Sequence, residues 1–109
     1  MLVLCDNGAP RGLARFLTGH SVEEARARGW EELSNGELID AAERAGFELM
    51  VTTDKNIRHQ QNLRARKIAL VVLEHSQWPM VKLVAENIVA AVNAAEAGSY
   101  VEVDVPFKE

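Results

Sequence analysis

The sequence has a single cysteine, no apolar run longer than six residues, and no basic N-terminal stretch leading into a long apolar one. With Cys5 alone, no internal disulfide can form. A membrane-spanning helix needs about 20 consecutive apolar residues, so the short runs exclude one. The N-terminus also lacks the pattern of a secretory signal peptide. Together these absences predict a soluble protein of the reducing cytoplasm that does not bind a membrane.

Several enzyme signatures are missing as well. The chain has neither the Gly-x-x-x-x-Gly-Lys loop that cradles nucleotide phosphates nor the Gly-x-Gly-x-x-Gly turn of dinucleotide-binding folds. It has no Gly-x-Ser-x-Gly nucleophile turn, and its three histidines lack the spacing of zinc ligands. Cys5 falls inside an apolar run, where we expect inert packing rather than nucleophilic chemistry.

The composition is that of one globular domain covering residues 1–109. Hydrophobic residues make up 48% of the chain and charged residues 26%, which is typical of a folded soluble protein. The net charge of −4 argues against a protein that coats nucleic acid by bulk electrostatics. Residues 55–73, however, carry five basic side chains and no acidic one. This segment is either a phosphate-binding surface or an ordinary solvated surface.

Apolar runs alternate with helical patterns along the chain. Short apolar or alternating runs predict strands over residues 1–5, 47–53, 67–73 and 100–105, with a brief strand or turn at 20–22. Periodic patterns and caps predict a helix opened by Pro10 and further helices over 22–28, 34–45 and 79–95. Such alternation predicts a three-layer α/β/α sandwich with a mostly parallel central sheet. The last strand reads as a half-exposed edge strand.

Acidic residues stand where two apolar runs end. Asp6 follows the first run, Asp54 follows the run over 47–53, and Glu37 lies in the first turn of the helix between them. If the runs are parallel strands, their carboxyl ends meet at one edge of the sheet, where open α/β folds bind ligands. Crowded carboxylates favour a hard divalent cation such as Mg²⁺ or Mn²⁺, which can activate water for phosphodiester hydrolysis.

Each acid also has a purely structural explanation. Asp6 can form a turn before Gly8, Glu37 can close a capping box with Ser34, and Asp54 can cap the helix that follows. The amides of Asn7, Asn35 and Asn56 can complete a metal's ligand set or serve in turns and caps. These alternatives stay open at the level of the residues.

Short motifs in the first 75 residues resemble a small family of PIN-like proteins of bacteria. The opening Leu-Val-Leu-Cys-Asp-Asn-Gly-Ala-Pro is similar to the Asp-Glu-Asn-x-Pro start of that family. The resemblance continues through Gly-His-Ser-Val at 19–22, Asn-Gly-Glu-Leu at 35–38, Val-Thr-Thr-Asp-Lys-Asn at 51–56 and Gln-Gln-Asn-Leu at 60–63. The remaining length suits a PIN-like fold.

The resemblance implies a metal-dependent ribonuclease, of the kind found as the toxin of toxin–antitoxin pairs. Asp6, Glu37 and Asp54 match the family's acidic, metal-binding positions, and Asn56 stands where many PIN nucleases carry a fourth acid. Asn7 replaces a frequent Glu. Both amides lower the negative charge of the site, because an amide is a weaker ligand than a carboxylate for a hard cation.

Further residues complete this prediction. Lys55, Arg58 and Arg64 are expected to hold the RNA backbone, and Gln61 to orient water or phosphate. The expected partners are RNA, an antitoxin protein and a second copy of the chain. The alternative function is a catalytically inactive PIN-like module that acts through protein contacts, for which the helix over 79–95 offers a surface.

Overall fold

The computed structural model describes residues 1–57 and 66–106. These residues form a five-stranded, all-parallel sheet in the order β2-β1-β3-β4-β5. The strands are β1 (Leu2–Cys5), β2 (Ser21–Glu24), β3 (Leu49–Thr52), β4 (Ala69–Leu73) and β5 (Tyr100–Val103). The predicted α/β class with a parallel sheet is therefore confirmed. Within the described residues, no helix is long and apolar enough to cross a membrane.

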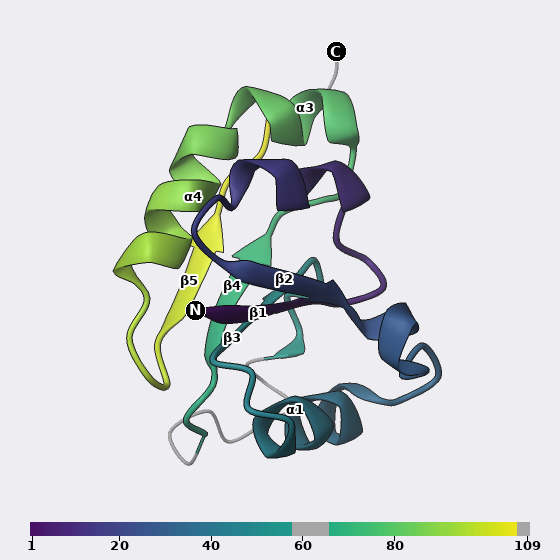
Figure 1. Cartoon of the computed structure of the whole chain (residues 1–109). Helices are drawn as coiled ribbons and strands as arrows, with labels where there is room; N and C mark the ends of the chain where they lie inside the picture. Colours follow the sequence, from purple (N-terminus) through teal and green to yellow (C-terminus); the bar gives the residue numbers. More distant parts are fainter. Residues whose placement is uncertain (58–65, 107–109) are drawn as a thin grey trace.

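Helices cover both faces of the sheet (Figure 1). On one side, α1 (Asn35–Arg44) and the short 3-10 helix η2 (Ala25–Arg28) cover a core that includes Leu4, Met50 and Leu70. On the other, the 3-10 helix η1 (Arg11–Phe16), α3 (Trp78–Leu83) and α4 (Ala85–Ala94) cover a core that includes Val3, Val51 and Val71. The central strands are buried on both faces, as their continuous apolar runs predict.

Helix α1 begins where the sequence predicts. The Ser34 hydroxyl accepts a hydrogen bond from Glu37 N, and Glu37 Oε1 accepts one from Ser34 N. This capping box satisfies two of the backbone N–H groups that a helix start leaves without partners. Leu38, Ile39 and Ala42 form the buried stripe of the helix.

Two helix predictions were right only in part. Of the predicted helix over 22–28, only Ala25–Arg28 is helical, and the brief strand predicted at 20–22 is present as β2. Ser21 and Glu24 have capping-box spacing, but Ser21–Glu24 pairs with β1 as a strand, and Ser21 N donates to Met1 O at 3.0 Å. Strand pairing satisfies the backbone groups that the predicted helix would have used. The predicted long helix is divided at Val84, whose φ of −113° and ψ of 19° end α3 and precede α4. Val81 in α3 and Ile88 in α4 both lie in the core.

The strand order places a reversal of direction beside the predicted acids. From β1 the chain moves outward to β2 and then crosses back to β3 on the opposite side of β1. The carboxyl ends of β1 and β3 therefore flank the point where connections leave in opposite directions, which is where open α/β sheets bind ligands. Asp6 and Asp54 follow these two strand ends.

Candidate functional site

Asp6 is held at the end of β1 by hydrogen bonds of both its side chain and its backbone. Its Oδ1 accepts from Gly8 N at 2.9 Å and Ala9 N at 3.1 Å, and its Oδ2 accepts from the Thr52 hydroxyl. Its backbone N donates to Val51 O at 3.0 Å, which ties the residue to β3. The turn predicted before Gly8 is therefore present, and it fixes the orientation of the carboxylate.

Thr52 joins the two strand-end acids. Its side chain is fully buried at the last position of β3. The hydroxyl donates to Asp6 Oδ2 and accepts a hydrogen bond from Asp54 N at 3.1 Å. Because its hydroxyl both donates and accepts a hydrogen bond, the buried Thr52 fixes the Asp6 carboxylate and the Asp54 backbone. Sequence reasoning missed Thr52, and its only signal is that it stands two residues before Asp54.

Asp54 is held by the neighbouring loop and by the start of α1. Its Oδ2 accepts from Asn35 Nδ2 at 2.5 Å, and its Oδ1 accepts from Asn56 N at 3.0 Å. Asn35, a candidate ligand from the sequence, thus takes part in the site as an amide donor to Asp54. Asn56 contributes a backbone N–H here, which is the turn role that stood as its alternative.

The electrostatics of Asp6 favour a positive partner. Burial raises the pKa of the Asp6 carboxyl above its ordinary value, and the negative charge of Asp54 raises this pKa further. Hydrogen bonds from Thr52, Gly8 and Ala9 lower the pKa and offset part of this effect. Because the ionised pair is costly in this partly buried place, a cation bound between them would offset that cost.

The Glu37 carboxylate has the capping-box role described above and is exposed. The backbone hydrogen bond from Ser34 lowers the pKa of Glu37, and neither Asp6 nor Asp54 contributes to this shift. The structural alternative for Glu37 is thus present, and its place in a metal site stays a prediction.

Lys55 lies next to Asp54 at the same edge. Its side chain is 51% exposed, and its Nζ lies 3.8 Å from Glu74 Oε1. Glu74 follows β4 and also accepts a hydrogen bond from Val105 N at 3.1 Å through Oε2. An exposed ion pair at this distance contributes little to stability. Because its side chain is half exposed, Lys55 is accessible to an anionic ligand. The other predicted RNA-binding residues, Arg58, Gln61 and Arg64, lie outside the described residues.

The donor set fits a lightly held magnesium or manganese ion rather than a closed cage. Within residues 1–57 and 66–106, no three or more His, Cys, Asp or Glu side chains gather as a metal site. Mg²⁺ is commonly bound by one or two carboxylates and keeps several waters or takes substrate phosphates. A carboxylate has about four lone-pair sites. Asp54 uses two of them in the hydrogen bonds described above, which leaves room for a cation.

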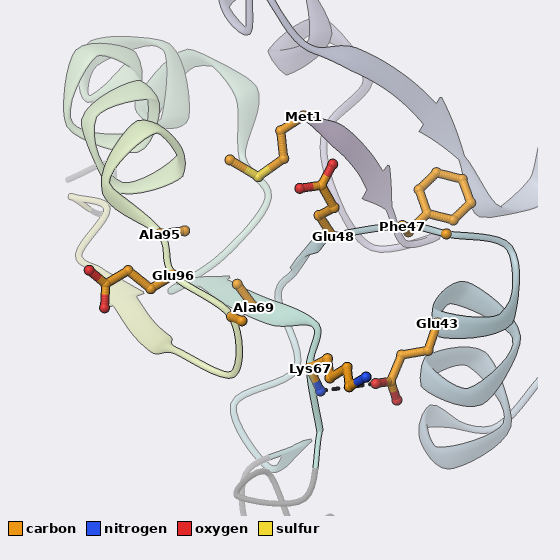
Figure 2. A pocket seen from close by; sticks show the side chains of 10 residues that line it. Met1, Glu43, Phe47, Glu48, Lys67, Ala69, Ala95 and Glu96 are labelled. Atoms are coloured by element: carbon orange, nitrogen blue, oxygen red, sulfur yellow. Dashed lines mark hydrogen bonds between the residues drawn. The ribbon is translucent and has the colours of Figure 1, made fainter.

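A cavity of about 320 Å³ opens at the opposite, amino-terminal edge of the sheet. Its lining includes Met1, Glu48 and Lys67, and none of the predicted site residues (Figure 2). Glu43 also lines the cavity. Its carboxylate accepts hydrogen bonds from Arg66 Nη1 and from Lys67 N, both at 3.0 Å. The cavity therefore does not coincide with the acidic edge.

Comparison with known proteins leaves this site to be judged on its own geometry. No family model, curated protein or solved structure matches the chain.

Proposed function

We propose that this chain is a PIN-like, Mg²⁺- or Mn²⁺-dependent endoribonuclease. The observation that carries the proposal is the pair of acids at the β1/β3 switch point: the buried Thr52 hydroxyl donates to the Asp6 carboxylate and accepts from the backbone N–H of Asp54. Such an oxygen-rich, negatively charged pair suits a hard cation and, beside it, a phosphodiester.

Each residue of the site has a role that follows from its chemistry. When bound, the metal ion supplies a water of lowered pKa and neutralises charge on the phosphate. Asp6 and Asp54 would hold the ion. Thr52 keeps the Asp6 carboxylate in place, and Asn35 and the backbone of Asn56 hold that of Asp54. Glu37 and Asn56 are candidates for weaker or water-mediated contacts. Lys55, with Arg58 and Arg64, would bind the RNA backbone and position it without reading its sequence. Hydrolysis would leave a 5′-phosphate.

The test is cleavage of single-stranded and structured RNA with Mg²⁺, with Mn²⁺ and with a chelator. Asp54→Asn should abolish metal-dependent cleavage. The matched control is Glu86→Gln, which also changes a carboxylate to an amide but lies exposed on α4. Cleavage that survives both the chelator and Asp54→Asn would reject the proposal, because the activity would then be independent of this site.

A second candidate function is a non-catalytic PIN-like module that binds another protein, such as an antitoxin or a second copy of the chain. The residue that allows a test of it is Leu83, an apolar side chain at the end of α3 that is 71% exposed. Leu83→Glu should then weaken self-association or partner binding in sedimentation experiments. An unchanged mass, together with RNA cleavage by the wild type, favours the nuclease.

A further inference from the structure

Asn35 is the first residue of α1, and its side chain is not part of the helix cap. Ser34 is the N-cap, and Ser34 and Glu37 complete the capping box between them. Asparagine is also a weaker helix former than alanine or leucine, because its amide competes for backbone partners. Neither capping nor helix propensity therefore accounts for an asparagine at this position.

The amide of Asn35 is used at the acidic edge instead. Asn35 is partly buried, and its Nδ2 donates to Asp54 Oδ2 at 2.5 Å. An ionised carboxylate only accepts hydrogen bonds, so the nitrogen of the amide, and not its oxygen, must face Asp54. Asn35 therefore meets the site as a donor, whereas a metal ligand would have to present the amide oxygen.

The two acids of the site depend on different supports. The carboxylate of Asp6 is held by its own turn and by Thr52 in β3. The carboxylate of Asp54 is held by the backbone N–H of Asn56 and by the side chain of Asn35, which comes from α1. Because that helix packs on one face of the sheet, the placement of the Asp54 carboxylate depends on α1 as well as on β3.

We propose that Asn35 is a positioning residue for the metal site, which holds the Asp54 carboxylate in place for Mg²⁺ or Mn²⁺. Hydrogen-bond donors behind a metal ligand orient it, and losing one typically lowers metal affinity or activity about 10- to 100-fold. This inference rests on the proposed ribonuclease function and deepens it. It adds a residue of α1 that acts through Asp54 and not by contact with RNA.

The experiment measures Mn²⁺ affinity by calorimetry, and the melting temperature in a chelator, for the wild type and three variants of Asn35. Asn35→Ala and Asn35→Leu both lose the donor, and leucine keeps most of the volume. Both should bind Mn²⁺ about 10- to 100-fold more weakly than the wild type. Asn35→Gln keeps an amide donor on a longer side chain and should recover part of the affinity.

Asn93→Ala is the matched control. Asn93 lies on α4, on the other face of the sheet, and its Oδ1 is 2.7 Å from His20 Nε2. This variant also loses the hydrogen bond of an asparagine side chain, but away from both acids. It should bind Mn²⁺ like the wild type even if its melting temperature falls.

RNA cleavage at saturating Mn²⁺ gives a second readout. Asn35→Ala should show a lower kcat, because the Asp54 carboxylate is no longer fixed. The KM for RNA should not change, because Asn35 acts on Asp54 and does not bind the substrate. A raised KM with an unchanged kcat would contradict the positioning role.

Three results would overturn the inference alone. Wild-type Mn²⁺ affinity in Asn35→Ala and Asn35→Leu would mean that the bond to Asp54 serves only to pack α1. An equal loss of affinity in Asn93→Ala would mean that the loss reflects stability in general. An Asn35→Gln variant that binds no more tightly than Asn35→Leu would mean that the donor makes no difference.

Failure of the proposed function would look different. A wild-type protein that binds no Mn²⁺ would reject the metal site itself, and this inference with it. If Asn35→Ala fails to fold, the comparison of Asn35→Leu with Asn35→Gln still decides the question, because these two variants differ in the donor and both fill the position.

Discussion

Replacement of Thr52 by valine tests how the acidic edge is held together. Valine has nearly the same shape as threonine but a methyl group in place of the hydroxyl. The change removes the donor to Asp6 Oδ2 and the acceptor for Asp54 N. Because Thr52 is fully buried, water cannot readily replace the missing hydroxyl.

The expected loss of stability follows from these two bonds. A hydrogen bond to a charged group contributes about 1.5–3 kcal/mol, and one between neutral groups about 0.5–1.5 kcal/mol. Thr52→Val should therefore lower the free energy of unfolding by roughly 2–4 kcal/mol. Thr52→Ser, the matched control, keeps the hydroxyl and loses one buried methyl group, so it should cost only about 1 kcal/mol.

The assay is urea unfolding of both variants at neutral pH with a chelator present, so that metal binding does not contribute. The slope of the unfolding free energy against urea should not change, because the same surface is exposed on unfolding. If Thr52→Val were as stable as Thr52→Ser, the buried hydroxyl would not be what holds the two acids. The role given to Thr52 would then have to be abandoned.

Three further predictions concern other parts of the molecule. Glu37→Gln should keep the melting temperature, because glutamine also closes a capping box. It should weaken Mn²⁺ binding in calorimetry, and an unchanged affinity would show that Glu37 does not belong to the metal site. Burial raises the pKa of the Cys5 thiol to about 12. The native protein at pH 8 should therefore not react with a thiol reagent until it is unfolded, and rapid labelling of the native protein would contradict this burial. The hydrogen bond from Arg66 lowers the pKa of the Asp40 carboxyl. This pair should therefore stabilise the fold above the carboxyl's ordinary pKa and lose its effect as the pH falls through the lowered value; Asp40→Asn should flatten the acid limb of stability against pH, and an unchanged limb would show that the pair contributes nothing.

Local signals in the sequence were sufficient for the elements that depend on nearby residues. The capping box at Ser34 and Glu37 fixed the start of α1, because its hydrogen bonds span only three residues. The apolar run that contains β4 indicated a strand buried on both faces, because only such a strand has no polar side to expose. The acids after β1 and β3 could be placed at one edge once the strands were taken as parallel.

Elements decided by distant partners could not be predicted in this way. The sequence indicates a brief strand or turn at 20–22 and a helix from 22, yet pairing with β1 extends the strand to Glu24. The break at Val84 carries no glycine or proline, so nothing local marks it. The strand at Ser21–Glu24 depends on pairing with β1, a distant partner that a local pattern does not contain.

The sequence by itself determined the alternation of strands and helices, the burial of the central strands and the acids at two strand ends, because each follows from the period and length of local runs. Only the tertiary structure decided the strand order that puts β1 beside β3, the use of Thr52 to join Asp6 to Asp54, the contact of Asn35 with Asp54, and the close approach of Thr53 to Gly8. These contacts join residues up to 46 positions apart. They exist only after the strands have paired, so the final form of the site is a property of the folded sheet.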